Sequence, residues 1–308
     1  IDTEYGGVFW MLDHKVNPAE TRKQMYAQAF AIYALAEYYR LTNDQQAKTL
    51  AIELFECIEK YSYDPVHQGY LEALGRDWTA LADVRLSDKD ANEAKSMNTH
   101  LHILEAYTNL YRIWPDALLK SRLEALIEVF LEKFIDAQSL HFKLFFTESW
   151  ENRSTAISYG HDIEGSWLLT EAADVVQNTT LQERTRNIAM KMAKVTAEEG
   201  LDEDGGLWNE RHIGASLPEN EKHWWPQAEA VVGFVNAWQL NAGDMYLEHA
   251  YKVWTFIKKH IKDHEHGEWF FRLNEHKQAV RDEDKAGPWK CPYHNGRMCI
   301  EILERFHS

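Results

Sequence analysis

One kind of segment recurs along the chain and limits what it can fold into. Each copy has an acidic turn, a glycine and then aromatic residues, and the copies are DTEYGGVFWM (2–11), DPVHQGYLEAL (64–74), DEDGGLWNER (202–211) and DHEHGEWFFRL (263–273). Gly6 and Gly69 are 63 residues apart, and Gly205 and Gly267 are 62 apart. Segments that return at a fixed period are typical of repeat architectures. The chain is therefore expected to consist of helix–helix–turn units.

The stretches between these segments have helical periodicity. Apolar residues recur at i, i+3, i+4 and i+7 in nine of them, namely 23–39, 45–61, 94–113, 117–136, 163–177, 181–199, 223–240, 245–262 and 291–306. One helix pair cannot bury its apolar face alone, so neighbouring pairs must stack. We predict an all-α fold, an (α/α)6 barrel or toroid of helical hairpins, in a single domain over residues 1–308. Six hairpins need twelve helices, so the N-terminal helix pair is expected to be absent from this chain.

The composition argues against several classes of function. The chain has 33 Lys+Arg against 49 Asp+Glu, a net charge of −16, which argues against binding nucleic acid or an anionic membrane. No apolar run approaches the ~20 residues of a membrane span. Three cysteines are too few for a disulfide framework, so we expect reduced thiols and a cytoplasmic protein. Twelve tryptophans exceed ordinary packing needs, and flat aromatic faces suit sugar rings.

The segment MNTHLHILEAY (97–107) contains the first candidate histidine. Asn98, His102 and Glu105 stand at i, i+4 and i+7, so they share one face of a helix. His100 lies two positions from His102 and points to another face, which argues against a metal pair. Taken alone, His102 could equally be a hydrogen-bonded core histidine.

The segment SYGHDIEGSW (158–167) combines several polar groups at the start of a helix. His161 and Glu164 are i, i+3 neighbours, and Trp167 lies one turn further. Asp162 can simply interact with the helix N-terminus. With Glu164 placed to orient its ring and raise its basicity, His161 is better interpreted as a general base.

Two further segments place aromatic and ionisable residues at helix starts. In KAGPWKCPYHNGRMC (285–299) two prolines stiffen a loop, Trp289 projects from it and His294 opens the last helix. In HWWPQAEA (223–230) Trp225 and Glu229 stand at i, i+4 on one face. Each segment could also be ordinary packing or capping.

The chemistry that these residues suit is proton transfer. The chain has no glycine-rich phosphate loop, nucleophile elbow or HExxH motif. A pair of near-neutral histidines can take a proton from one face of a carbon and return it to the other, which suits epimerisation next to a carbonyl. Glycoside cleavage would instead favour two opposed carboxylates.

The segments SYGHDIEGSW, WWPQAEAVVGFVNAW and GPWKCPYHNGRMC together resemble the N-acylglucosamine 2-epimerase superfamily over the whole chain. PWKCPYHNGRMC resembles the branch that acts on disaccharides. The resemblance implies an (α/α)6 barrel, in agreement with the repeat. It also implies a carbohydrate 2-epimerase, an isomerase without metal or other cofactor that converts the reducing-end glucose of cellobiose or lactose to mannose through a cis-enediolate.

The resemblance also implies roles for individual residues. His161 and His294 match the acid/base pair, and His102 matches a third histidine that serves ring opening. The implied substrate-binding residues are Tyr26, Asn98, Glu164, Trp167, Trp225, Glu229 and Trp289. The family carries a site arginine in an N-terminal helix pair that this sequence does not include, which makes activity of the chain alone doubtful.

Other functions stay open at this point. An N-acylglucosamine 2-epimerase or an aldose–ketose (mannose) isomerase would use the same enediolate. An inverting glycosidase could use Glu164 and Glu229 as its carboxylates, and a noncatalytic sugar-binding module would bind without turnover. We expect a monomer whose partner is a small disaccharide.

Overall fold

The computed structural model describes residues 1–307. Within them lie nine α-helices, as the periodicity predicts, so the all-α class is confirmed. Their bounds are α1 Met25–Thr42, α2 Gln45–Tyr61, α3 Met97–Ile113, α4 Ala117–Val129, α5 Tyr159–Val176, α6 Thr179–Val195, α7 Trp224–Gln239, α8 Met245–Phe256 and α9 Tyr293–His307.

The ends of three predicted helices differ from the observed ones. Three helices continue as short π-helical turns, η1 Phe130–Phe134, η2 Thr196–Gly200 and η3 Ile257–Ile261. The helix predicted from residue 163 begins at Tyr159. The apolar pattern starts later than the helix because Gly160 interrupts it. His161 therefore lies inside the first turn.

Strands are short and only join the helices. Their bounds are β1 Met11–Leu12, β2 Pro18–Glu20, β3 Lys23–Gln24, β4 Ala73–Leu74, β5 Lys95–Ser96, β6 Phe145–Phe146, β7 Ala156–Ser158, β8 Glu210–His212, β9 Lys222–His223 and β10 Arg272–Leu273. They pair two by two, all antiparallel: β1 with β2, β3 with β4, β5 with β6, β7 with β8, and β9 with β10.

The chain divides into two compact units, each made of three stretches. Unit 1 comprises Ile1–Ile135, Lys143–Ser154 and Glu171–Gln182; unit 2 comprises Asp136–Phe142, Thr155–Thr170 and the chain from Glu183 onward. The expectation of one catalytic domain over residues 1–308 stays a prediction.

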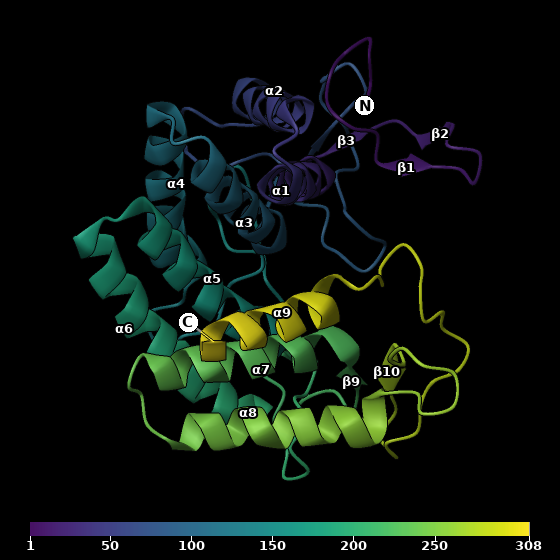
Figure 1. Ribbon diagram of the computed structural model, residues 1–308, viewed down its shortest axis with the longest axis vertical. Helices are drawn as coiled ribbons and strands as arrows, with labels where there is room; N and C mark the ends of the chain where they lie inside the picture. Colours follow the sequence, from purple (N-terminus) through teal and green to yellow (C-terminus); the bar gives the residue numbers. More distant parts are fainter. Residues whose placement is uncertain (308) are drawn as a thin grey trace. The chain divides into compact units, whose positions relative to one another are not determined.

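In unit 1, α1 packs against both α2 and α3 (Figure 1). Residues Met97–Leu110 of α3 are buried almost without interruption, whereas α2 buries only one stripe, Ala47, Ala51, Leu54, Phe55 and Ile58. A helix buried all round lies inside a fold, and a helix with one apolar stripe covers its outside. The histidine-bearing helix α3 is therefore an inner helix of its unit.

In unit 2, α7 has the corresponding inner position and packs against α8 and α9 (Figure 1). It also approaches the start of α5 closely. A Cβ on Gly233 would lie 2.5 Å from Cγ1 of Ile163, and one on Gly160 would lie 2.5 Å from the Trp225 ring. Only residues without side chains allow this approach, which brings His161 next to α7.

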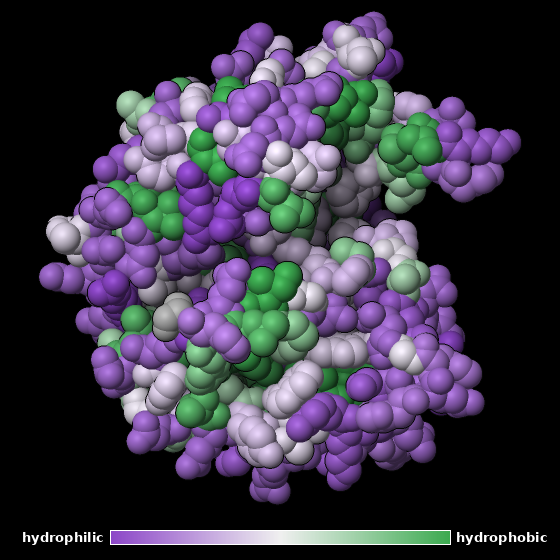
Figure 2. Space-filling view, in the orientation of Figure 1, coloured by the Kyte–Doolittle hydropathy of each residue, from purple (hydrophilic) through white to green (hydrophobic). Residues whose placement is uncertain are grey.

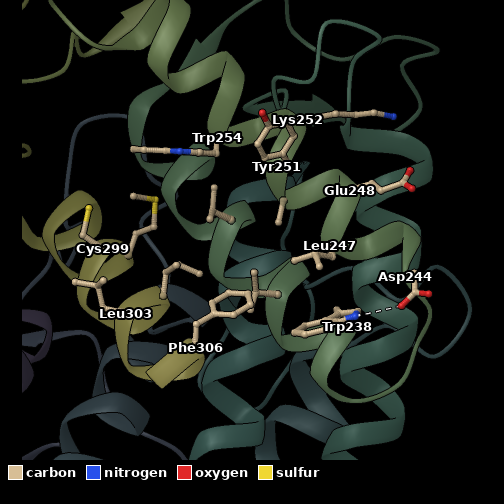
Figure 3. Close-up of a pocket in the computed structure, with 15 residues that line it drawn as sticks. Trp238, Asp244, Leu247, Glu248, Tyr251, Lys252, Trp254, Cys299, Leu303 and Phe306 are labelled. Atoms are coloured by element: carbon tan, nitrogen blue, oxygen red, sulfur yellow. Dashed lines mark hydrogen bonds between the residues drawn. The ribbon is translucent and has the colours of Figure 1, made fainter. Parts of the chain in front are cut away.

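Helix α9 has two unlike faces. His294 and Arg297 are on one of them, while Met298, Cys299 and Leu303 line an apolar groove of about 1080 Å³ with α7 and α8 (Figure 3). Exposed apolar side chains also gather over α9 in Figure 2, where Ile300, Leu303 and Phe306 are half or more exposed. The groove is thus separate from the histidine-bearing face.

The recurring acidic turns share one design. In each of the four, an aspartate carboxylate accepts from the backbone of the turn, namely Asp2, Asp64, Asp202 and Asp263. Asp136 does the same in a further turn that the sequence repeat did not include. A lysine ammonium neutralises four of these carboxylates, in the pairs Lys23–Asp2, Lys95–Asp64, Lys222–Asp202 and Lys285–Asp263. The repeat read from the sequence therefore has a common structural basis.

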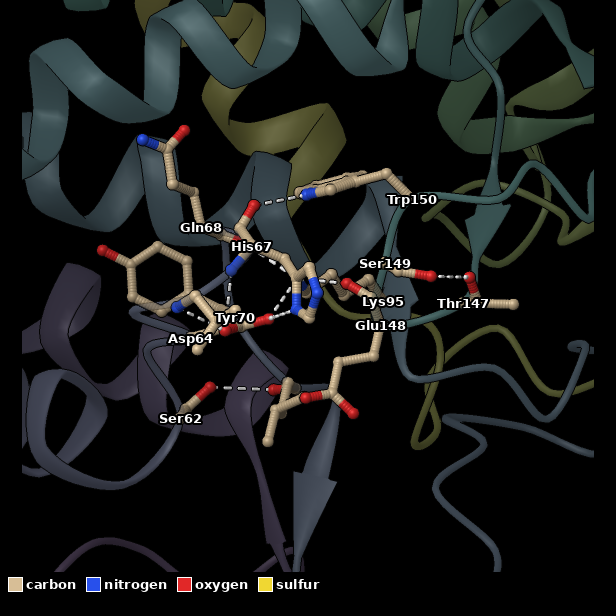
Figure 4. A network of polar contacts seen from close by, with 12 residues as sticks. Ser62, Asp64, His67, Gln68, Tyr70, Lys95, Thr147, Glu148, Ser149 and Trp150 are labelled. Carbon is tan, nitrogen blue, oxygen red and sulfur yellow. Dashed lines mark hydrogen bonds and ion pairs between the residues drawn. The ribbon is translucent and has the colours of Figure 1, made fainter.

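Near the turn at Asp64, three residues could hold a metal ion, but the ammonium of Lys95 bonds there. Donor atoms of Asp64, His67 and Glu148 lie close together (Figure 4). Lys95 Nζ donates to Asp64 Oδ2 at 2.8 Å and to the backbone carbonyls of Gln68 and Glu148. Burial opposes ionisation of Asp64, but Lys95 and the backbone amides outweigh it and lower the pKa of Asp64 to about 2. The buried ammonium already supplies the positive charge there.

Among residues 1–307, every helix is too short or too polar to cross a membrane.

Candidate active site

His161 is the third residue of α5, and its ring contacts a serine hydroxyl. Its Nδ1 lies 2.8 Å from Oγ of Ser158, the last residue of β7. The sequence predicted Glu164 as the group that orients this ring. Glu164 Oε1 accepts from Arg297, and an orienting role of Glu164 toward His161 stays a prediction. The residue three positions before His161 is a partner that the sequence did not suggest.

His294 lies near the start of α9 and is held by a carboxylate. Its Nδ1 lies 2.6 Å from Oε1 of Glu229 on α7. Since an ionised carboxylate only accepts hydrogen bonds, Nδ1 of His294 donates the proton of this bond. Its side chain keeps 15% exposure, so the ring is not sealed in the core.

One tryptophan links the two histidines. The Trp225 ring centroid lies 4.7 Å from that of His161 and 5.4 Å from that of His294. Both imidazoles therefore contact the same indole, that of Trp225. Because α5, α7 and α9 contribute one residue each, the pair exists only in the folded unit.

Arg297 joins this cluster, and sequence reasoning missed it. Its Nη2 donates to Glu164 Oε1 at 2.8 Å and to Glu229 Oε1 at 2.7 Å. Its guanidinium also stacks on the Trp167 ring at 4.8 Å. The available signal was its i, i+3 spacing from His294 in HNGR, which places both on one helical face.

The charges in this cluster lower the pKa of the Glu229 carboxyl. Burial alone would raise its pKa, but the Arg297 guanidinium and His294 outweigh burial and lower the pKa of Glu229 to about 2. Glu164, Glu229 and His294 also place three donor atoms within metal-binding distance. Arg297 already bonds both carboxylates, so a cation is present without a metal.

Three residues that were predicted to contact the substrate are almost fully buried. Trp167 is 1% exposed, and Glu164 and Glu229 are 1% and 0% exposed. The Trp167 indole N–H donates to Glu229 Oε2 at 3.0 Å. The Trp167 ring is thus buried against Glu229, Glu229 bonds His294 and Arg297, and Glu164 bonds Arg297. Direct contact of these three residues with a substrate stays a prediction. Their spacing in sequence could not reveal that they face inward.

Trp289 matches its predicted position more closely. It stands in the turn Gly287–Lys290 before α9 and is 47% exposed. The neighbouring Lys290 is buried and donates to Glu268 at 2.7 Å, which anchors the loop. A fixed loop with an exposed indole is suited to contact a ligand.

Unit 1 contains the remaining predicted residues. His102 on α3 contacts the rings of Tyr26 at 4.9 Å and Phe30 at 4.6 Å, and its Nδ1 lies 3.1 Å from Glu105 Oε2. Asn98 stands one turn earlier on α3, and its buried Oδ1 has no hydrogen-bond partner among the described residues. The shared helical face that the sequence predicted is consistent with the His102–Glu105 contact.

Two other histidines are structural. His100 accepts from the Tyr70 backbone N–H at 2.9 Å, and burial lowers its pKa to about 3. His141 lies 2.7 Å from Asp162, whose other oxygen accepts from the Phe142 backbone N–H. Asp162 thus anchors the start of α5 beside His161, as a structural partner rather than a catalytic one.

A helical-hairpin fold that brings two histidines onto one indole is suited to an enzyme of acid/base chemistry at carbon. Residues 1–296 match the family model described as N-acylglucosamine 2-epimerase (GlcNAc 2-epimerase). The chain belongs to the N-acylglucosamine 2-epimerase family.

Individual relatives agree in sequence and in fold. A cellobiose 2-epimerase of Bacteroides fragilis is 49% identical over 98% of this chain and 77% of its own length. One of Dictyoglomus turgidum is 40% identical over 99% of this chain and 77% of its own length. The structure of cellobiose 2-epimerase from Bacillus thermoamylovorans matches with a TM-score of 0.94 and 39% identity, over 99% of this chain and 78% of its own.

Proposed function

We propose that the chain is a cellobiose 2-epimerase, an isomerase that converts the reducing-end glucose of β-1,4-linked disaccharides such as cellobiose and lactose to mannose. The observation that carries the proposal is the contact of His161 and His294 with one Trp225 ring. Epimerisation needs an acid and a base near one carbon atom. The names of the relatives supply the substrate class.

In the proposed reaction, one proton leaves C2 and another proton is then added to C2. One histidine removes the C2 proton of the open-chain sugar, and the electron pair forms the C1–C2 double bond of a cis-enediolate. The other histidine then protonates C2 from the opposite face while the C1 carbonyl re-forms. The net change is inversion at C2, without a cofactor.

The remaining roles rest on the resemblance to the family. His102 serves ring opening, and Tyr26, Asn98, Trp225 and Trp289 bind the sugar. Glu164, Trp167 and Glu229, to which the resemblance assigns substrate binding, hold His294 and Arg297 in place. We also propose that the protein works as a cytoplasmic monomer, in keeping with its three free cysteines.

The geometry does not favour an inverting glycosidase. Such an enzyme needs two carboxyl groups about 6.5–9.5 Å apart with sugar and water between them. Glu164 and Glu229 instead bond the same nitrogen of Arg297, and both are buried. No glycosidic bond can enter between them.

The test is deuterium incorporation at C2 of cellobiose in heavy water. Wild type should exchange this hydrogen and form the mannose epimer, and His161→Ala and His294→Ala should each lose about 10²-fold or more of the rate. His264→Ala, on an exposed turn, is the matched control and should keep the rate. Free glucose would indicate a glycosidase, a ketose product an isomerase, and exchange that survives both substitutions would refute the assigned pair.

A further inference from the structure

His141 is a buried histidine that the proposed reaction does not use. It is 2% exposed and stands in the short stretch Asp136–Phe142, which belongs to unit 2 together with the start of α5. Its Nδ1 lies 2.7 Å from Oδ2 of Asp162 on α5, and its Nε2 lies 3.3 Å from Oε2 of Glu199 in η2. The ring thus joins the first turn of α5, which carries His161, to the end of a different helix.

The residue after His141 fastens the same helix. The backbone N–H of Phe142 donates to Oδ1 of Asp162 at 2.7 Å. A Cβ on Gly165 would lie 2.3 Å from the Phe142 ring, so this ring lies directly on the α5 backbone. Both oxygens of Asp162 are therefore held by one dipeptide, and the first two turns of α5 are packed against it.

The charges around His141 suit a protonated ring. Ionised carboxylates only accept hydrogen bonds, so a ring between two of them donates from both nitrogens. Burial alone would lower the pKa of His141, but its contacts with the Asp162 and Glu199 carboxylates outweigh burial and raise it. Arg211 Nη2 donates to the same Glu199 oxygen and so holds the outer carboxylate in place. The inner carboxylate, at the start of α5, is bonded by the buried ring.

We propose that His141 is a positioning residue for His161: through its bond to Asp162 it holds the first turn of α5 in the place that proton transfer at C2 requires. Asp162 and His161 are neighbours in sequence, so His141 acts through the backbone of this turn. A misplacement of a catalytic group by about 1 Å can cost about 10²-fold in rate. The inference rests on the proposed function and adds a residue to it.

An asparagine and a glutamine at position 141 make a matched test. The amide nitrogen of asparagine is bonded to Cγ, as Nδ1 of histidine is, and that of glutamine is one atom further out, as Nε2 is. His141→Asn therefore keeps a donor for Asp162, and His141→Gln keeps a donor for Glu199 instead. Both variants lose the positive charge and should lose stability alike, so they differ in the contact with α5.

Steady-state epimerisation of cellobiose measures the first effect. His141→Gln should lower kcat on the order of 10- to 100-fold with little change in KM, because the base is misplaced while the sugar still binds. His141→Asn should keep most of kcat. His276→Gln, at an exposed position, is the control and should keep the wild-type kcat.

A second readout does not depend on how much of the enzyme is folded. In heavy water, return of a proton to the face of C2 that it left gives deuterated cellobiose, and protonation of the opposite face gives the deuterated epimer. The ratio of these products at early times depends on where the two histidines stand relative to C2. His141→Gln should change this ratio several-fold, and His141→Asn should leave it near the wild-type value. Equal kcat and equal ratios in the two variants overturn the proposal.

Backbone hydrogen exchange separates this proposal from the proposed function. The amides of residues 163–166 donate to carbonyls of the first turn of α5. They should exchange faster in His141→Gln than in His141→Asn, while the amides of α8 should exchange alike in both. Equal exchange at residues 163–166 overturns the proposal. If wild type fails to epimerise cellobiose, the proposed function falls, and this measurement still decides whether His141 holds the turn.

Discussion

Nδ1 of His294 lies 2.6 Å from Oε1 of Glu229, a carboxylate that has no exposed surface. The same oxygen accepts from Arg297, and the other oxygen accepts from the Trp167 indole. A fully bonded, buried carboxylate cannot turn toward a substrate. Its effect on catalysis must therefore pass through the histidine that it holds.

Replacing Glu229 tests this relationship. Glu229→Gln keeps an oxygen for Nδ1–H but removes the charge that stabilises the imidazolium, so kcat should fall by about 10²-fold or more while KM changes little. Steady-state epimerisation of cellobiose measures both. The exposed Glu198→Gln is the control and should behave as wild type. A rise in KM at unchanged kcat would instead mean that Glu229 touches the sugar.

Removing the Arg297 charge should destabilise the fold. Arg297→Met leaves Glu164 and Glu229 as neighbouring buried carboxylates with no guanidinium between them. Breaking a buried ion pair in this way costs about 3–5 kcal/mol. Urea unfolding followed by circular dichroism measures the loss. Arg281→Met, at an exposed position, should leave the midpoint unchanged. Equal midpoints for both variants would contradict the role assigned to Arg297.

The buried carboxyl of Glu72 predicts a pH effect on stability. Burial raises its pKa to about 7, although the Ser96 and Thr99 hydroxyls donate to its two oxygens. The folded state thus binds this proton more tightly than the unfolded state, whose pKa is about 4.3. Its contribution to the free energy of unfolding is present below about pH 4 and is lost as pH rises through about 7.

Glu72→Gln should remove this decline. The variant has no titrating group at the site, so it should be more stable relative to wild type at about pH 8 than at about pH 5. Urea unfolding at the two pH values measures the difference. Glu198→Gln serves again as the exposed control and should follow wild type. Parallel pH profiles for Glu72→Gln and wild type would count against the raised pKa.

The buried lysine of the acidic turn predicts a further loss of stability. Lys95→Met removes the ammonium that bonds Asp64 and two backbone carbonyls, so the buried Asp64 carboxylate loses its lysine partner. We expect a loss on the order of 3 kcal/mol in the free energy of unfolding. Lys89→Met, on an exposed loop, is the matched control. Equal loss in the two variants, measured by urea unfolding, would contradict the structural role of the turn.

Part of the candidate site could be predicted because its signals are local. Helical periodicity placed the nine helices, and the segments SYGHDIEGSW and KAGPWKCPYHNGRMC marked two helix starts. The sequence did not point to Ser158 or Arg297, and it did not show that Glu164 and Trp167 are buried. The contacts of these four residues depend on what packs against them. Burial and partner choice leave no periodic trace in a sequence.

The sequence by itself determined the helices, the recurring acidic turns and the histidines at helix starts, because propensity, periodicity and turn chemistry act over a few residues. Tertiary structure decided that His294 pairs with Glu229, 65 residues away along the chain, and that Ser158 bonds His161. The physical reason is that close packing of α5, α7 and α9 excludes water. Each buried charge there must then find its partner in space and not in sequence.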